Sequence, residues 1–565
     1  MAQLSLDEAT RLLTAPGMPF EIEEVEIRGR LTRTWKHAPR TLRALTERMR
    51  EHGDRTYLVY ENERLSFAEA YSRVARLAHT LVGRCGVERG DRVAIAMRNY
   101  PEWPITFWAA ASIGAIVVPL NAWWKGDELE YGLADSGAQV LVADAERAAL
   151  LEPHYASLDL RDVFVVRPEA ALANGLTPFD EALDPSGSDS ALPDAEVDPD
   201  DDATIFYTSG TTGHPKGALG THRNLCTNVA SSMYGPARAL ARRGEAPPPP
   251  DAPREAGVSL ISIPFFHVTG SHSILATATW NGDKLVMMYR WNPERALELI
   301  ERERIHSFGG VPSMAWQVIE SPDFEKRDTS SVVRVAYGGA PAAPELVRRI
   351  RERFPQARPG QGYGMTETSA IATSNHGEDY VRQPDSIGPP VPVCDVKVIG
   401  PDGETLPPGE VGELCMRGPN IVRGYWGKPE ATAETFRDGW CHSGDIARID
   451  GEGLVYLVDR AKDMLIRGGE NVYCVEVEDV LYGHADVMDA AVVGIPDRVL
   501  GEEVGAVVQV TPSSGATEAE LRAHVAARLA RFKVPVKIDL RREPLPRNAS
   551  GKILKSVLRE EITAS

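Results

Sequence analysis

The segment with the greatest density of potential chemistry is Tyr207-Thr-Ser-Gly-Thr-Thr-Gly-His-Pro-Lys-Gly217. Its three glycines let backbone N–H groups turn toward an anion, four Ser and Thr hydroxyls add donors, and Lys216 adds a mobile positive charge. This composition predicts a cradle for polyphosphate. The Walker pattern fails in every register because Pro215 stands where a glycine must precede Lys216, so a P-loop kinase or GTPase is not expected. A flexible turn is the usual alternative, but an expected strand over 203–206 and a helix capped by Thr221 favour a binding loop.

Four further segments that combine acids, glycines and cations follow this loop. Glu367 is the one acid in a tight turn of glycines and threonines, Asp445 follows a glycine, and Lys552 ends a polar run. The alternatives are a solvated charge for Glu367 and Lys552 and a turn residue for Asp445. The segments are Gly362-Tyr-Gly-Met-Thr-Glu-Thr368, His442-Ser-Gly-Asp445, Asp459-Arg460 with Arg467-Gly-Gly-Glu-Asn471, and Arg547-Asn-Ala-Ser-Gly-Lys552.

In this order the five segments resemble the motifs of the adenylate-forming superfamily, which contains acyl-CoA and aryl-CoA synthetases, beetle luciferases and the adenylation domains of peptide synthetases. The similarity extends from about residue 40 to the C-terminus and is greatest to fatty-acyl and aryl-CoA ligases. It implies an ATP-dependent acid–CoA ligase that activates a hydrophobic carboxylic acid, fatty or aryl, as acyl-AMP with release of pyrophosphate. The acyl-CoA thioester then forms, so ATP, Mg²⁺ and coenzyme A are the implied cofactors.

The resemblance also assigns residues to the nucleotide. The phosphate loop would hold the β- and γ-phosphates, Tyr363 would face adenine, and Asp445 would accept hydrogen bonds from the ribose hydroxyls. Thr366 would reach the α-phosphate, and Glu367 with Thr211 would hold Mg²⁺, because one carboxylate plus phosphate oxygens is a common magnesium site. The implied ATP-binding residues are Thr208, Ser209, Gly210, Thr211, Thr212, Gly213, Lys216, Gly338, Gly339, Ala340, Gly362, Tyr363, Gly364, Met365, Asp445 and Arg460.

The acid and its activation involve a second implied set. Lys552 would bridge the substrate carboxylate and the α-phosphate, where charge neutralisation and in-line positioning do most of the catalysis. His267, in Pro264-Phe-Phe-His-Val-Thr-Gly270, would gate the acyl carboxylate, the alternative being a core histidine with a satisfied ring. The implied catalytic residues are Lys552, Glu367, Thr366 and His267, and the implied acyl pocket is lined by His267, Gly310, Gly338, Gly339 and Met365.

The second half reaction implies movement, because a thiol cannot reach an adenylate that the lysine loop still covers. The family places its hinge two residues after the ribose-contacting arginine, which here is Lys462. Gly468 and Gly469, with Glu470 beside them, would line the channel for the pantetheine arm of CoA.

Short β-branched runs that alternate with helical segments must position these residues. They imply an α/β protein with parallel sheets covered on both faces. With the resemblance, we expect a large N-terminal domain, 1–459, of stacked mostly parallel sheets with helices plus a distorted barrel, and a small mobile α+β C-terminal domain, 460–565. The runs are Val93–Met97, Ala115–Val118, Gln139–Ala143, Val163–Val166, Val258–Ile263, Lys284–Met288 and Val332–Ala336.

Local signals refine this picture. Ser66 with Glu69 predicts a capping box and a helix behind it. The polar segment 184–202 and the Pro-rich segment 235–257 predict connectors, the second a surface insertion. In the C-terminal part we expect strands over 490–494, 504–510 and 534–540 and a helix over 518–530.

Composition bounds the function classes. The chain has 565 residues, 43% hydrophobic and 25% charged, with a net charge of −19, so a disordered or nucleic-acid-binding protein is not expected. Six scattered cysteines and an N-terminus without a leader pattern predict a cytoplasmic protein without a membrane span. The stretch from Arg531 to Lys555 is a local exception to this acidity, because it contains eight basic residues and only two acids. Such a stretch suits nucleotide phosphates, and the alternative is an ordinary solvated face.

Two alternatives stay open. An adenylating enzyme that passes its acyl group to a carrier protein or an amine is the nearest, and an inactive nucleotide-binding scaffold is disfavoured by intact Lys216, Glu367, Asp445 and Lys552. The small-molecule acid and CoA are the expected partners, with a homodimer also considered.

Overall fold

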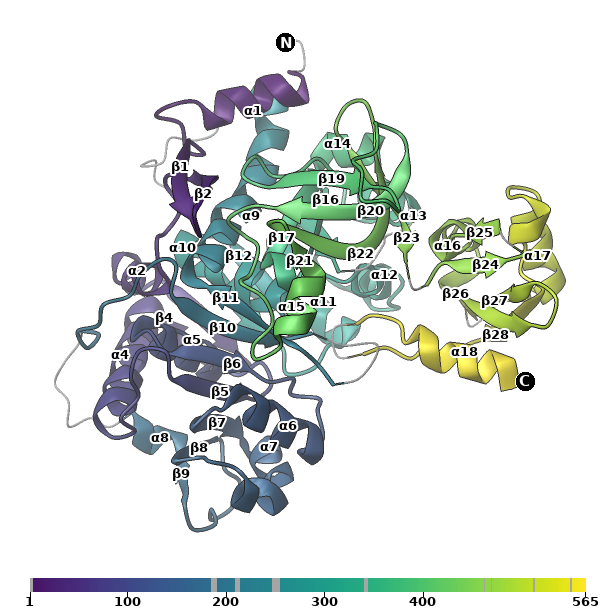
Figure 1. Ribbon diagram of the computed structural model, residues 1–565. Coiled ribbons are helices and arrows are strands. Elements are labelled where there is room, and N and C mark those ends of the chain that lie inside the picture. Colours follow the sequence, from purple (N-terminus) through teal and green to yellow (C-terminus); the bar gives the residue numbers. More distant parts are fainter. Residues whose placement is uncertain are drawn as a thin grey trace.

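The computed structural model describes residues 4–183, 191–208, 214–245, 255–339, 344–461, 463–468, 470–511, 514–548 and 551–564. Figure 1 shows a large body and, beside it, a smaller lobe formed by the chain after β23 (Val455–Arg460). The α/β prediction is confirmed, since parallel sheets in the body are layered with helices.

The first large sheet of the body is built as its strand sequences dictate. Its central strands are parallel and buried on both faces, with Val93 and Ile95 in one core and Ala94 and Ala96 in another. The hydrogen-bonded order is β11 (Gly217–Thr221), β10 (Asp202–Tyr207), β6 (Ile116–Pro119), β5 (Arg92–Ala96), β7 (Val140–Asp144), β8 (Asp162–Val166) and β9 (Leu176–Pro178).

The second large sheet provides the edge at which the site lies. Its strands from β3 to β16 run parallel, and β4 and β17 are antiparallel at the two ends. The order is β17 (Ala370–His376), β16 (Arg358–Met365), β15 (Arg334–Gly338), β14 (Ser307–Gly310), β12 (Val258–Ile261), β13 (Lys284–Met287), β3 (Thr56–Tyr60) and β4 (Glu63–Ser66).

Helices fill the space between and around these sheets. Ser66 caps α4 (Phe67–Gly83) through the predicted box with Glu69, and α4 packs with α5 (Glu102–Ser112) in a core shared by both sheets. Thr221 caps α9 (His222–Arg242), as predicted. The other body helices are α1 (Leu6–Thr14), α2 (Leu42–Glu47), α3 (Met49–His52), α6 (Gly126–Ser136), α7 (Ala145–Leu150), α8 (Phe179–Ala182), α10 (Ala276–Asn281), α11 (Pro293–Glu303), α12 (Pro312–Ile319), α13 (Pro344–Arg353), α14 (Gly377–Arg382) and α15 (Pro429–Thr435).

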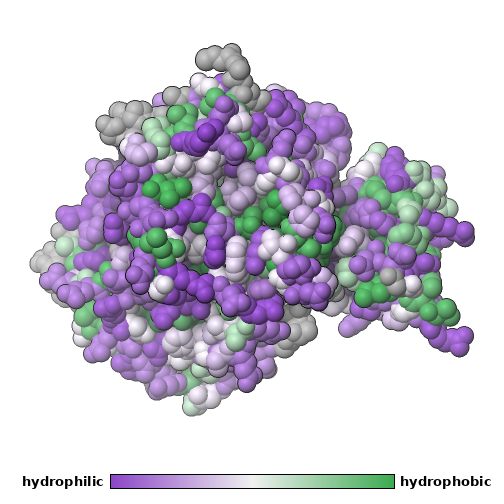
Figure 2. All heavy atoms as spheres, turned by 45° about the horizontal axis from the view of Figure 1, so that its top comes forward, coloured by the Kyte–Doolittle hydropathy of each residue, from purple (hydrophilic) through white to green (hydrophobic). Residues whose placement is uncertain are grey.

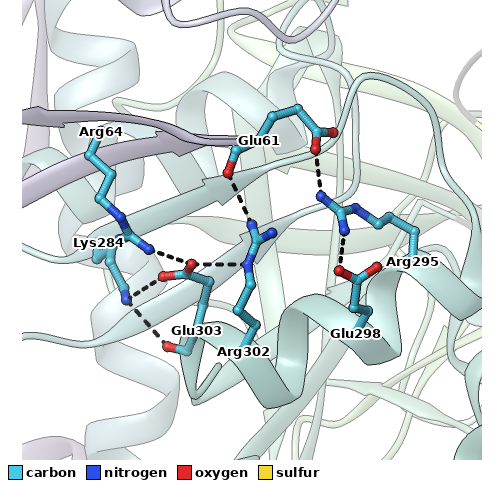
Figure 3. A network of polar contacts seen from close by, with 7 residues as sticks. All are labelled: Glu61, Arg64, Lys284, Arg295, Glu298, Arg302 and Glu303. Atoms are coloured by element: carbon cyan, nitrogen blue, oxygen red, sulfur yellow. Dashed lines mark hydrogen bonds and ion pairs between the residues drawn. The ribbon is translucent and has the colours of Figure 1, made fainter.

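A polar network fastens the β3–β4 hairpin to the later chain (Figure 3). Glu303, whose side chain is 2% exposed, accepts hydrogen bonds from Arg64 at 2.6 Å and Lys284 at 3.0 Å. The Glu61 carbonyl oxygen accepts from Arg302 at 3.1 Å, and the Glu61 carboxylate pairs with Arg295. The hairpin is therefore held both by strand pairing and by charge.

An antiparallel sheet completes the body in the region for which a distorted barrel was expected. Its order is β18 (Ser386–Gly388), β23, β22 (Trp440–Ile449), β20 (Val411–Arg417) and β19 (Asp395–Ile399), with β21 (Phe436–Arg437) on β22; β1 (Ile22–Ile27) and β2 (Arg30–Trp35) pair separately. The smaller lobe has its own cores and the order β25 (Glu470–Val472), β24 (Leu465–Arg467), β27 (Gly501–Val510) and β26 (Val487–Asp497), with β28 (Lys537–Arg541) on β27. Its helices are α16 (Cys474–Tyr482), α17 (Glu518–Ala526) and α18 (Lys555–Ala564).

Three local expectations differ from the structure. Residues 235–242 are the end of α9 and not a surface insertion, whereas 246–254 lie outside the described residues. An unpredicted strand, β11, precedes the predicted helix α9 and pairs antiparallel with β10. The helix from Glu518 ends at Ala526, and the last strand begins at Lys537.

Candidate active site

A cavity of about 1930 Å³ opens at the carboxyl edge of the second large sheet. Strands β14, β15 and β16 end here at Gly310, Gly338 and Met365, and the carboxyl edge of a parallel sheet is the usual place for a ligand. A Cβ on Gly338 would lie 2.4 Å from the Gly362 carbonyl oxygen, so only glycine allows the two strand ends to approach this closely. The volume exceeds the several hundred Å³ of an ordinary ligand pocket and accommodates more than one substrate.

The structure brings most of the predicted residues to this cavity. Those lining it are Thr208, Lys216, His267, Gly310, Gly338, Gly339, Gly362, Tyr363, Gly364, Met365, Thr366, Glu367, Asp445, Arg460 and Lys552. Ser209, Gly210, Thr211, Thr212, Gly213, Ala340, Lys462 and Gly469 lie outside the described residues.

Asp445 is held by groups from two directions. The β22–β23 register sets it opposite Arg460, whose Nε donates to Asp445 Oδ1 at 3.0 Å. The Tyr363 hydroxyl donates to Oδ2 at 2.6 Å. Burial, followed by the Asp445 charge, raises the pKa of Tyr363 well above its usual range, so this hydroxyl keeps its proton. The carboxylate, 6% exposed, is thus fixed in place as a hydrogen-bond acceptor at the cavity wall.

Glu367 lies in the short turn Thr366–Thr368 that follows β16, and it is 7% exposed. Its Oε1 accepts a hydrogen bond of 2.6 Å from the Tyr425 hydroxyl. The Lys216 ammonium lies 5.1 Å from the centre of the Tyr425 ring, within the range of a cation–π contact. Tyr425 therefore joins the predicted acid to the predicted lysine.

Sequence reasoning missed Tyr425. Its segment lies beside β11: Leu219 N donates to the Gly424 carbonyl at 2.9 Å and Trp426 N to the Gly217 carbonyl at 2.8 Å. An aromatic pair within Gly424-Tyr-Trp-Gly427 is the only available signal, and it does not reveal the partner strand.

The residues around Glu367 fit a magnesium ion. Among the residues that the structure describes, Oε2 of Glu367 has no hydrogen bond or ion pair, whereas Oε1 is fixed by Tyr425. One buried carboxylate with a free oxygen, beside a place for phosphates, is the donor set that Mg²⁺ commonly takes.

His267 follows β12 and lines the cavity with its ring partly buried. Thr269 N donates to its Nδ1 at 3.3 Å, which assigns the proton of the neutral ring to Nε2. Burial, with a smaller effect from Lys552, lowers the pKa of His267 to about 4. The ring is therefore neutral at pH 7, and it lies near enough to Lys552 to sense its charge.

Lys552 reaches the cavity on a tight turn from the smaller lobe. Asn548 N donates to the Lys552 carbonyl at 2.8 Å, and Lys552 N donates to Asn548 Oδ1 at 3.0 Å. Gly551 has φ +81°, and a Cβ there would lie 2.7 Å from Val311 of the body. Gly551 thus lies closely against the body, and Lys552 lines the cavity.

The two described residues of the predicted CoA set lie elsewhere. Gly468 and Glu470 are in the β24–β25 hairpin of the smaller lobe, where Gly468 N donates to the Leu500 carbonyl at 2.8 Å, and neither lines the cavity. The present arrangement brings the lysine loop, and not this hairpin, to the site.

Comparisons with known proteins agree with this geometry. A model of the AMP-binding enzyme family matches residues 45–426, and one of the AMP-binding enzyme C-terminal domain matches 476–552. The chain belongs to this family, and the predicted membership of the adenylate-forming superfamily is confirmed.

Individual relatives are acid–CoA ligases. The chain is 38% identical to a feruloyl-CoA synthase from Amycolatopsis sp, covering 88% of this chain and 93% of the relative, and 34% identical to the long-chain-fatty-acid–CoA ligase FadD13 from Mycobacterium tuberculosis, covering 89% and 94%. The crystal structure of the anthranilate CoA ligase AuaEII with anthranoyl-AMP matches with a TM-score of 0.82 at 25% identity, covering 93% of this chain and 97% of that one. Family and relatives together support ATP-dependent acid–CoA ligase activity, as predicted.

In the parts of the chain that the structure describes, no helix is long and apolar enough to cross a membrane. Figure 2 shows a mostly hydrophilic surface on which apolar residues gather near the middle of this face and on the smaller lobe.

Proposed function

We propose that the protein activates a hydrophobic carboxylic acid, fatty or aryl, with ATP and Mg²⁺, and then transfers the acyl group to CoA. One observation carries this proposal: Lys552 of the smaller lobe lies in the cavity beside His267, while Asp445, Glu367 and Lys216 line the same cavity. A cation between a carboxylate site and a nucleotide site is what adenylation requires.

In the first half reaction an oxygen of the substrate carboxylate attacks the α-phosphorus of ATP, and pyrophosphate leaves. Two anions approach each other, so the protein must neutralise charge and align the groups. Lys552 supplies an ammonium between them. Neutral His267 offers its Nε2 proton to the carboxylate without adding charge, and Asp445 accepts hydrogen bonds from the ribose hydroxyls.

Other groups hold the phosphates. Lys216 and the loop after Thr208 would bind the β- and γ-phosphates, and Thr366 would contact the α-phosphate. Glu367 would hold Mg²⁺, which when bound offsets phosphate charge. Tyr425 fixes the Glu367 carboxylate through its hydroxyl and supports Lys216 with its ring.

The acyl chain would lie along the face of the second large sheet. Besides His267, the cavity is lined by Gly309 and Ala336 on the sheet and by Ile274 and Ala278 on the covering helices. Small residues on the sheet and apolar residues on the covering helices suit a hydrophobic chain or ring. The names of the relatives include both fatty and aryl acids.

In the second half reaction the CoA thiol attacks the acyl carbon and AMP leaves. We propose that the small domain, 460–565, rotates about Lys462 and replaces the lysine loop at the cavity with the hairpin that carries Gly468, Gly469 and Glu470. A rotation is needed because Gly468 and Glu470 lie outside the cavity here. A cytoplasmic location and a homodimer stay predictions.

The test is pyrophosphate release with a panel of fatty and aryl acids, with CoA, hydroxylamine, amines or no acceptor. Acid-dependent release with CoA-dependent thioester formation is expected. Product formation only with amines or with a carrier protein would favour the alternative transferase, and no release with any acid would refute the proposal.

Lys552→Ala tests the catalytic assignment. It should abolish acid-dependent ATP–pyrophosphate exchange, yet leave supplied acyl-AMP able to react with CoA. Exchange at the wild-type rate would contradict the role of Lys552.

A further inference from the structure

Within the basic stretch from Arg531 to Lys555, several cations form ion pairs in the folded protein. Lys533 pairs with Glu476, Arg541 with Asp539, and Arg547 with Asp489, all within the smaller lobe. Lys555 also pairs within the lobe, with Glu478, but its charge in addition lowers the pKa of Asp459 in the body. This difference suggests a role that the nucleotide does not explain.

Lys555 is anchored first to its own lobe. It begins α18, three residues after Lys552, and its Nζ lies 2.7 Å from Oε1 of Glu478 on α16. The two side chains are 23% and 11% exposed. Val492 N donates to the same Glu478 oxygen at 2.7 Å, which ties the pair to β26. The start of α18 is therefore fixed to the sheet of the lobe.

The same ammonium acts on the connection between body and lobe. Burial raises the pKa of Asp459, the penultimate residue of β23, to about 6, and Lys555 opposes that rise. Against the effect of burial, Glu478 raises the pKa of Lys555, with smaller effects from Cys474 and from Asp463 on the lobe side of the connection. Asp459 also accepts hydrogen bonds from Arg460 N and Cys474 N, so its carboxylate is held at the junction.

Glu478 of the lobe raises the pKa of Asp459 in the body, and Lys555 is the cation that offsets this effect. Asp459 and Asp385 belong to the body, and Glu478 and Asp479 belong to α16 of the lobe. Burial, with smaller effects from Glu478, Asp385 and Glu476, raises the pKa of Asp479 to about 8, so this side chain is mostly protonated near pH 7 and adds little negative charge to the seam. Like charges repel most strongly where water is excluded.

We propose that Lys555 is a positioning residue that holds the smaller lobe against the body in the orientation that delivers Lys552 to the cavity. Lys555 touches no reacting atom. It joins the start of α18 to α16 and attracts Asp459 across the junction, so it favours adenylation over the open or rotated arrangement. The inference rests on the proposed function, since it assigns Lys555 to one of its two half reactions.

The experiment measures both half reactions separately in the full-length protein. Lys555→Met should lower acid-dependent ATP–pyrophosphate exchange about tenfold or more, the loss expected when a partly buried ion pair is broken. Thioester formation from supplied acyl-AMP and CoA should stay within about twofold of wild type, because that step does not use this arrangement. Lys555→Arg should retain most of the exchange.

Lys533→Met is the matched control. It also removes a lysine that pairs with a glutamate of α16, but its partner is Glu476, so both half reactions should be unchanged. In a double variant, Asp459→Asn should reduce the loss of exchange caused by Lys555→Met, because it removes a negative charge that Lys555 would otherwise offset. Thermal unfolding of every variant separates positioning from instability, and Lys555→Arg keeps the test decisive if Lys555→Met does not fold.

Equal loss of both half reactions in a folded Lys555→Met variant would overturn the inference, as would unchanged exchange. Either result, with active wild-type protein, leaves the proposed function intact. Wild-type protein without exchange for any acid overturns the proposed function, and the inference with it.

Discussion

The hydroxyl of Tyr425 should control how well Glu367 works, and Tyr425→Phe isolates that hydroxyl. The substitution removes the 2.6 Å hydrogen bond to Glu367 Oε1 but keeps the ring beneath Lys216. A hydrogen bond to a charged group contributes about 1.5–3 kcal/mol, and each 1.4 kcal/mol is about tenfold in rate. If the bond persists in the transition state, exchange should fall about 10- to 100-fold.

The assay is acid-dependent ATP–pyrophosphate exchange at several Mg²⁺ concentrations. We expect Tyr425→Phe to lower the rate and to raise the Mg²⁺ concentration needed for half of the maximal rate, because a carboxylate that is no longer fixed must be ordered at each turnover. Tyr425→Leu, which also removes the ring, should lower the exchange rate more than Tyr425→Phe does.

A double-mutant cycle gives the decisive comparison. In a Glu367→Gln background Tyr425→Phe should have almost no further effect, since its hydroxyl then has no carboxylate to orient. Rates of Tyr425→Phe within about twofold of wild type, or losses that simply add in the double variant, would refute the reasoning.

Three other changes test separate parts of the structure. Gly551→Val should lower exchange more than thioester formation from acyl-AMP, because its φ of +81° and the 2.7 Å approach to Val311 leave no room for a side chain; equal effects on both steps would contradict this. Glu303→Gln should lower the free energy of unfolding by about 1–3 kcal/mol in chemical denaturation, since the charge partner of Arg64 and Lys284 is lost. Burial favours the neutral form of Glu303, but these hydrogen bonds outweigh it and lower its pKa, so its contribution should be present above about pH 4.5 and fade as the pH falls below that value. Burial lowers the pKa of His222 to about 4, so between about pH 6.5 and 4 the unfolded chain binds a proton that the folded protein does not, and the melting temperature should fall as the pH is lowered through this range. His222→Asn should make this fall less steep, and an unchanged slope would contradict the assignment.

Most of the scaffold could be predicted because its signals are local. Strands such as β5 and β7 are continuous apolar runs, as strands buried on both faces must be. Ser66 and Glu69 predict the capping box at the start of α4. In contrast, Gly235 and Pro236 suggested a loop, yet α9 continues through them because Tyr234 and Arg238 are buried on either side. Tertiary packing overrides a weak local propensity.

The residues of the candidate site likewise fall into those that the sequence predicts and those that it does not. Glu367, Asp445 and Lys552 stand in ordered motifs and could be found from the sequence. Tyr425 could not, because its bond to Glu367 joins residues 58 positions apart and depends on pairing beside β11. The ion pair of Lys555 with Glu478 was equally hidden, since the sequence shows a run of basic residues but not which acids face it.

The strand order of the second large sheet has a consequence for the order of synthesis. β3 pairs in parallel with β13, so a hairpin made within the first 66 residues cannot complete its pairing until residues 284–287 have left the ribosome. The first large sheet is complete by Thr221 and can fold earlier. The strand edge of this hairpin therefore stays unpaired while some 220 further residues are synthesised, at about 5–20 residues per second. Chaperone demand during translation should concentrate in that interval.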